Sequence, residues 1–168
     1  MGRYDATPAW RPWLMAALLL LAAAGLQGLV AGTIYGWCGA QPDLLLTVTL
    51  CVALLSDPQI GAFLGFASGL LTASLVGQTV GTYLVSYTLA GYLAGRFTTR
   101  LFQANAFVIV LGVLAASAAA HVLHGLAAPS HLSLAFWLRT TLGGALWNAA
   151  LSLPISAVLR RSGWGSTY

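Results

Sequence analysis

The stretch Ile60–Gly77, IGAFLGFASGLLTASLVG, carries a small residue at every fourth position. The row consists of Gly61, Gly65, Gly69, Ala73 and Gly77. In water, each glycine inside a helix costs about 0.5–1 kcal/mol relative to alanine. Inside a membrane, helices associate by close backbone contact across small residues, so the same glycines become useful. The row therefore predicts a membrane-embedded helix with a packing face.

The composition of the whole chain agrees with a membrane location. Of the 168 residues, 59% are hydrophobic and 6% are charged, whereas soluble domains carry about 25% charged residues. The charges are seven Arg and three Asp, with no Lys and no Glu. Apolar runs of membrane-spanning length recur from Trp13 to Leu159. These features predict an all-α integral membrane protein, and the lack of a basic stripe with interleaved aromatics argues against nucleic-acid binding.

The apolar runs divide into six predicted transmembrane helices. They cover about 13–35, 42–56, 60–76, 79–95, 106–123 and 134–159. Asp57-Pro58 predicts a turn, and the stretches 96–105 and 125–130 predict loops. The second helix would rise only about 22 Å against a hydrocarbon core of about 30 Å. We expect neighbouring helices or a thinned bilayer to shelter it.

The arginines predict the orientation of these helices. Six of them form three groups that a six-span chain places on one side: Arg3 and Arg11, Arg96 and Arg100, Arg160 and Arg161. Under the positive-inside rule that side is the cytoplasm. We therefore expect one compact transmembrane domain over residues 1–168 with both termini inside. Residues 1–12 and 160–168 would be its cytoplasmic ends, and the short loops leave no room for a separate catalytic domain.

The predicted fourth helix carries small residues that match the glycine row of the third. They are Ala90, Gly91, Ala94 and Gly95. The two rows predict either close packing within this chain or a docking face for a helix of another chain. Gly77 and Gly81 lie nearer the outer surface, where a single-span partner could contact the bundle.

Few residues in the chain could carry chemistry. Cys38, Cys51, His121, His124 and His131 do not have the spacing of a standard metal site, so we expect free thiols, interfacial histidines and no metal. Three Asp and no Glu give little material for acid–base catalysis. The sequence therefore predicts a protein that is not an enzyme and needs no cofactor.

Three polar or helix-breaking residues fall inside the last predicted helix. Arg139 lies near its outer end, either reaching the membrane interface or facing the bundle to pair with a partner or an anionic head group. Asn148 lies in the middle of the helix and must find a hydrogen-bond partner on another helix. Pro154 predicts a kink near the inner end.

Two long stretches resemble the MreD family of rod shape-determining membrane proteins. The first is PDLLLTVTLCVALLSDPQIGAFLGFASGLLTASLVGQTVGTYLVSYTLAGYLAGRF, with Pro42-Asp43, the glycines of the third helix, and Tyr92-Leu93-Ala94 before Arg96. The second is FWLRTTLGGALWNAALSLPISAVLRR with its terminal basic pair. One departure is Ala73, which stands where the family often has an Asp, so no role of that carboxylate is carried over.

The resemblance implies a non-enzymatic scaffold of the bacterial cell-elongation and peptidoglycan-synthesis machinery in the cytoplasmic membrane. It implies binding to an MreC-like single-span protein. A RodA-type glycosyltransferase, its class B penicillin-binding protein and MreB-type filaments would be indirect partners, and homo-oligomerisation stays open.

The family is also similar in fold to the substrate-binding subunits of energy-coupling-factor transporters. This supplies an alternative function, a vitamin-type small-molecule binder. Such a binder needs convergent polar side chains, and the candidates are Thr47, Tyr83, Tyr87, His121 and Arg139. Because they are dispersed along the chain, the scaffold function is favoured.

Overall fold

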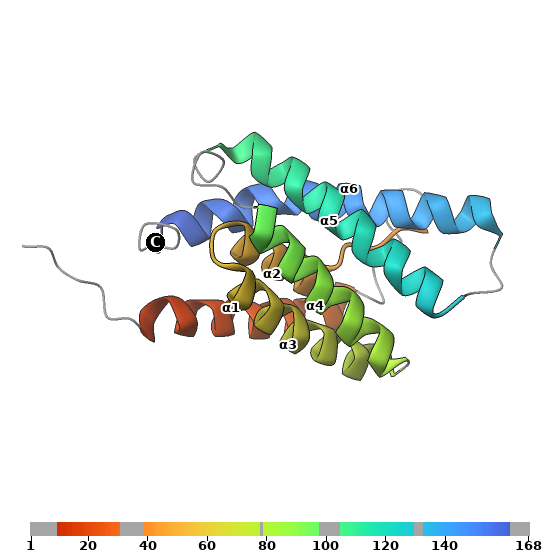
Figure 1. Ribbon diagram of the computed structural model, residues 1–168, viewed down its shortest axis with the longest axis horizontal. Coiled ribbons are helices and arrows are strands. Elements are labelled where there is room, and N and C mark those ends of the chain that lie inside the picture. The colour runs from red at the N-terminus through yellow and green to blue at the C-terminus, as the bar shows by residue number, and fades with distance from the viewer. Residues whose placement is uncertain (1–9, 31–38, 78, 98–104, 130–132, 162–168) are drawn as a thin grey trace, which may run out of the picture.

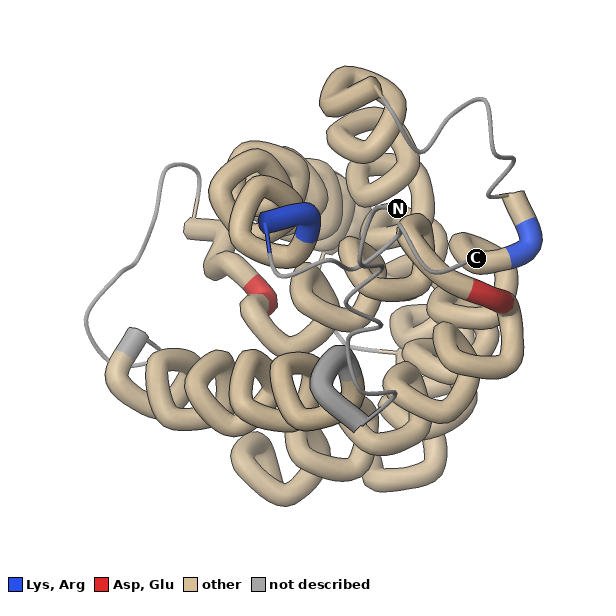
Figure 2. Tube along the Cα trace, turned by 90° about the vertical axis from the view of Figure 1, so that its left-hand side faces the viewer, with Lys and Arg blue, Asp and Glu red and all other residues tan. Residues whose placement is uncertain are grey.

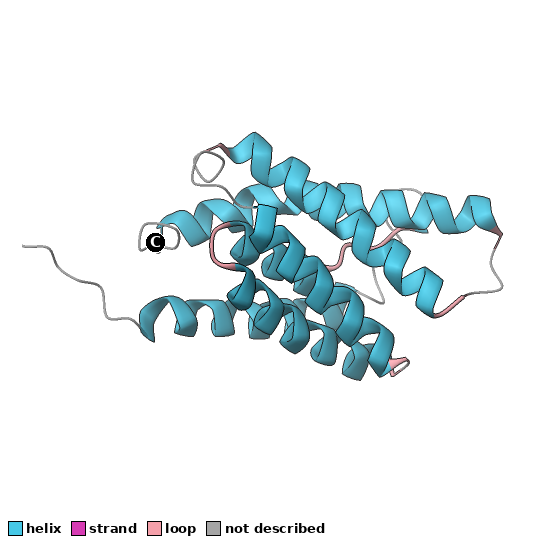
Figure 3. Ribbon diagram, in the orientation of Figure 1, coloured by secondary structure: helices cyan, strands magenta, loops and turns pink. Residues whose placement is uncertain are grey.

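The described part of the chain is almost entirely helical. The computed structural model describes residues 10–30, 39–77, 79–97, 105–129 and 133–161. Six helices follow in chain order (Figure 1): α1 Trp10–Val30, α2 Leu44–Leu54, α3 Pro58–Val76, α4 Val80–Phe97, α5 Ala106–Ala127 and α6 Leu134–Arg161. Within these residues no strand occurs, and the described residues outside the helices form loops and turns (Figure 3).

The number and order of the helices match the sequence prediction, but several bounds were wrong. Helix α2 is shorter than 42–56, because the Asp43 side chain caps its first turn and the helix ends at Leu54. Helix α5 continues to Ala127, so residues 125–127 are helical and not part of a loop. Arg96 and Phe97 belong to α4 rather than to the following loop. Residues 31–35 of the first predicted helix lie outside the described residues.

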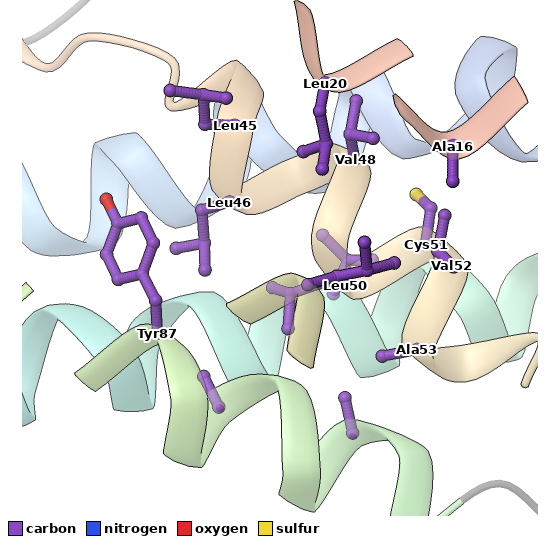
Figure 4. Close-up of a cluster of buried hydrophobic side chains, with 14 of the residues drawn as sticks. Ala16, Leu20, Leu45, Leu46, Val48, Leu50, Cys51, Val52, Ala53 and Tyr87 are labelled. Atoms are coloured by element: carbon purple, nitrogen blue, oxygen red, sulfur yellow. The ribbon is translucent and has the colours of Figure 1, made fainter. Parts of the chain in front are cut away.

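Helix α2 is the core of the bundle. It contacts all five other helices, and every residue from Leu45 to Ala53 is buried. The remaining helices surround it, with α3 against α4, α4 against α5 and α5 against α6. Figure 4 shows its side chains meeting Ala16 and Leu20 of α1 and Tyr87 of α4. The prediction that neighbours shelter this short helix is therefore confirmed.

The outer faces of the bundle are apolar. Large side chains such as Leu21, Leu29, Phe63 and Leu146 are exposed on them, which a soluble monomer of this size does not tolerate. Three helices, α3, α5 and α6, are long and apolar enough to cross a membrane by length and composition, and α1 and α2 contain shorter apolar stretches. The chain is therefore a membrane protein with several apolar helices.

The ends of the helices alternate between two ends of the bundle. Helix α1 begins at the same end at which α6 finishes (Figure 1). Figure 2 looks onto this end, where basic residues appear in blue on a tube that is otherwise largely uncharged. Arg96 lies in the last turn of α4, and Arg160 and Arg161 lie in the last turn of α6.

Candidate functional site: a polar hub at the start of the central helix

Helix α2 begins inside the bundle rather than at its edge. With 11 residues it is about 16 Å long, and the residues that enter it, Ala40, Pro42 and Asp43, are buried. The segment before it is not α-helical, so its N–H and C=O groups have no partners within a helix of their own. In an apolar environment such groups must find partners inside the protein. The start of α2 therefore requires polar side chains from other helices.

Gln27 of α1 supplies two of these partners. Its amide nitrogen donates to the Pro42 carbonyl at 3.0 Å, and its amide oxygen accepts from the Leu44 N–H at 2.8 Å. The two bonds hold the backbone on either side of Asp43. A single side chain thus fixes where the chain enters α2.

Asn148 of α6 holds the same segment from another side. Its side-chain oxygen accepts from the Asp43 N–H at 2.8 Å, while its amide nitrogen donates to the Ser117 hydroxyl of α5 at 2.7 Å. Asn148 and Ser117 are both fully buried. Asn148 therefore bonds helices α5 and α6 to the start of α2.

The Asp43 side chain is the centre of the network. One carboxylate oxygen accepts from the Leu46 N–H at 2.9 Å and so caps α2. The other accepts from the Tyr87 hydroxyl of α4. The Asp43 carbonyl accepts from the Thr47 hydroxyl at 2.6 Å. We call Gln27, Asp43, Tyr87, Ser117 and Asn148 the polar hub, because they connect α2 to helices α1, α4, α5 and α6.

Aromatic and imidazole rings extend the hub along α4 and α5. The Tyr83 ring packs edge-on against Tyr87, with centroids 5.7 Å apart, and the His124 ring lies 4.2 Å from that of Tyr83. On α5 one turn before, His121 faces Gly144 of α6. A side chain at Gly144 would place its β-carbon 3.5 Å from both the His121 Nε2 atom and the Gln41 carbonyl oxygen.

The glycine row of α3 determines how closely α4 approaches α3, and it therefore positions these tyrosines. A β-carbon at Gly61 would overlap the Gly91 carbonyl oxygen, and one at Gly65 would overlap the Tyr87 carbonyl oxygen. At Gly69 it would lie 2.7 Å from the Tyr83 oxygen. The α3 backbone therefore touches α4 at the turns that carry Tyr83 and Tyr87.

The other glycines of the two rows have different surroundings. Gly95 of α4 packs against the start of α3, since a β-carbon there would lie 2.7 Å from the Pro58 Cα. Gly77 ends α3 in the left-handed conformation with φ of 70°, which favours glycine. At Gly77 and Gly81 a β-carbon would meet nothing within 4 Å. These two positions are thus open to a neighbour outside the described residues.

Comparison with known proteins identifies the family. The family model for rod shape-determining protein MreD matches residues 9–162. The chain belongs to the MreD family. No curated protein and no solved structure matches it, so the expected likeness to transporter subunits stays a prediction. Membership of the MreD family implies a role in determining rod shape, and the match covers the complete hub.

The structure places the other predicted residues of this MreD chain as follows. Arg139 is exposed in the second turn of α6. Ala73, at the place where MreD proteins often have an Asp, is buried. Cys51 is a free, buried thiol of α2, whereas Cys38 and His131 lie outside the described residues. In the described ranges no group of three His, Cys or Asp side chains could hold a metal.

Sequence reasoning on this MreD chain missed Gln27 and the central place of Asp43. Asp43 was noticed as part of the family resemblance, and Gln27 was treated as an interior residue of the first helix. A signal did exist, because an ionisable residue within apolar segments is a functional candidate by default. Thr47, Tyr83 and Tyr87, named as ligand candidates, do come together near the hub, but Thr47 and Tyr87 bond Asp43 itself.

Proposed function

We propose that the chain is a non-enzymatic scaffold of the cell-elongation machinery in the bacterial cytoplasmic membrane. The observation that carries this proposal is the match of the MreD family over residues 9–162. The hub supports it, because the Asp43 carboxylate uses both oxygens for bonds to Leu46 and Tyr87. A carboxylate bonded in this way stabilises the packing of α2 against α4.

The scaffold has one transmembrane domain of six helices with both termini in the cytoplasm. The arginines at the ends of α4 and α6 support this orientation, since they share the end of the bundle at which α1 begins. Its direct partner is an MreC-like single-span protein. The RodA-type glycosyltransferase, its class B penicillin-binding protein and MreB-type filaments associate with the scaffold indirectly, through that partner.

Gly77 and Gly81 supply the surface for such a partner. They lie at the turn between α3 and α4, and both are open in the described structure. A partner helix or its juxtamembrane segment could approach the backbone closely there. The buried row Gly61, Gly65 and Gly69, in contrast, packs within the chain.

Depletion in the rod-shaped host tests the function. We expect cells to become round or swollen as the protein disappears, with uptake of vitamins unchanged. Re-expression of the wild-type chain should restore rods, measured as the ratio of cell length to width. A host that keeps its shape and instead requires a higher supply of one vitamin would replace the scaffold with the transporter-subunit function.

Co-purification tests the partner separately. Affinity purification of the chain in mild detergent, followed by mass spectrometry, should recover the MreC-like protein. The Gly81→Leu variant should remain abundant and monodisperse but recover less of it, whereas Gly25→Leu on α1, another glycine with open surroundings, serves as the control. Equal recovery with both variants would remove the turn between α3 and α4 as the partner surface.

A further inference from the structure

A buried glycine of α6 leaves room for a side chain that it does not carry. Gly144 is buried, yet a β-carbon there would come no closer than 3.5 Å to any described atom beyond its own stretch of helix. Gly61 and Gly65 are different, because a β-carbon at either would overlap the backbone of α4. Close helix packing therefore accounts for those two glycines but not for Gly144, where a methyl group would fit.

Two polar atoms border this space. They are the Nε2 atom of His121 on α5 and the backbone carbonyl oxygen of Gln41, each 3.5 Å from the position of that β-carbon. The His121 Nε2 atom is buried and has no hydrogen-bond partner among the described residues, whereas buried polar atoms normally have one. Gln41 precedes Asp43 by two residues, so the space lies beside the segment that leads into α2.

The two atoms determine which chemical group fits between them. A carbonyl oxygen only accepts hydrogen bonds, and a neutral imidazole donates from one of its ring nitrogens. A hydroxyl group satisfies both atoms, because it can accept from the His121 Nε2–H and donate to the Gln41 carbonyl at the same time. A charged group would find no opposite charge on the two atoms, and burying an unpaired charge is costly.

We propose that the space beside Gly144 binds a hydroxyl group, supplied by a water molecule or by a small uncharged alcohol. The bound hydroxyl connects α5 to the backbone that leads into α2, and it therefore stabilises the start of that helix. Its partners, His121 and the Gln41 carbonyl, are additional to the residues of the polar hub. This inference concerns binding inside the bundle and does not rest on the proposed scaffold function.

Variants at position 144 test the proposal by thermal unfolding of the full chain in detergent. Gly144→Ala fills the space with a methyl group that bonds neither polar atom, so the midpoint should fall by about 2–4 °C. Gly144→Ser fills the space and carries a hydroxyl of its own, so its midpoint should exceed that of Gly144→Ala. Without a bound hydroxyl, Gly144→Ala would be at least as stable as the wild type, since alanine is the better helix former.

Native mass spectrometry of the detergent-solubilised chain distinguishes the two sources of the hydroxyl. A bound alcohol adds a defined mass to the wild-type chain, and this mass should be missing from Gly144→Ala and from Gly144→Ser. A bound water adds no such mass. Either result supports the hydroxyl site when the unfolding midpoints follow the order given above.

Removal of the imidazole separates this effect from an intrinsic preference of position 144. In the His121→Phe background, the difference in midpoint between Gly144→Ser and Gly144→Ala should shrink, because the hydroxyl loses one of its partners. Gly28→Ala on α1, where a β-carbon meets nothing within 4 Å, is the control and should not lower the midpoint. A Gly144→Ala midpoint equal to or above that of the wild type, or a difference that His121→Phe leaves unchanged, would overturn the proposal.

Discussion

Asp43 shows how a single residue can organise a membrane protein. Its backbone N–H, its carbonyl and both carboxylate oxygens all have partners, and these partners come from α2, α4 and α6. A charge in apolar surroundings is stable when it is paired or fully hydrogen-bonded. The start of α2 supplies donors of its own, since the free N–H groups of a helix N-terminus favour an anion.

Gln27 offers the sharpest residue-scale prediction. Gln27→Ala leaves the Pro42 carbonyl and the Leu44 N–H without the partners that they have in the bundle. We expect a loss of about 1–3 kcal/mol in the free energy of unfolding, measured by thermal or denaturant unfolding in detergent. Gln59→Ala is the control, because it removes the same amide from an exposed position on α3. Equal stability of the two variants would show that water or lipid head groups replace the Gln27 bonds.

Helices α3 and α4 pack closely along several turns, so their contact is a property of the two helices and not of one residue. Gly61, Gly65 and Gly69 of α3 meet α4 without side chains between the backbones. The sequence row predicts this kind of contact, but it leaves open whether the opposite helix belongs to the same chain. In the structure, these three glycines pack against α4 of the same chain, because the atoms that they meet belong to Gly91, Tyr87 and Tyr83.

A matched pair of alanine variants tests the contact. Gly65→Ala places a methyl group into the backbone around Tyr87, and helices packed this closely must separate. We expect a loss of about 1–3 kcal/mol, together with lower abundance of the protein in membranes. Gly81→Ala, which adds the same methyl group where nothing lies within 4 Å, should be close to neutral. A Gly65→Ala protein as stable as Gly81→Ala would mean that the two helices do not pack as described.

The helix bounds show a second effect at this scale. The apolar pattern alone starts the second helix at Pro42, but the Asp43 side chain caps the Leu46 N–H, so the helix begins at Leu44. At the end of α5, the run of small and apolar residues continues as helix to Ala127, although the sequence analysis predicts a loop over 125–130. Gly125 instead gives room to the Trp137 ring of α6, since a β-carbon there would overlap its indole nitrogen region.

The orientation of the whole molecule in the membrane is the prediction with the widest consequence. Reporter fusions after Arg11, after Arg100 and at Tyr168 should all report the cytoplasm. A fusion at Pro129, just after the end of α5, should report the outside. The reason is the arginine distribution, with basic residues at the end of the bundle where α1 begins. A cytoplasmic signal at Pro129 would contradict the six-span topology.

The sequence by itself determined the class of the protein, the six helical segments and the small-residue face of α3. These properties depend on composition and on residue spacing within about twenty residues, so they can be predicted once the membrane is recognised as the solvent. The resemblance to the MreD family was also visible in the sequence, because it rests on two continuous stretches of residues.

Only the tertiary structure decided where these helices meet. Gln27, Asp43, Tyr87, Ser117 and Asn148 are scattered along the chain, and nothing in the spacing of these residues pairs one with another. Their meeting point follows from the burial of α2 among five helices. A helix that begins inside an apolar bundle exposes backbone groups there. The polar side chains that satisfy them come from whichever helices the packing brings near, and no local pattern records that choice.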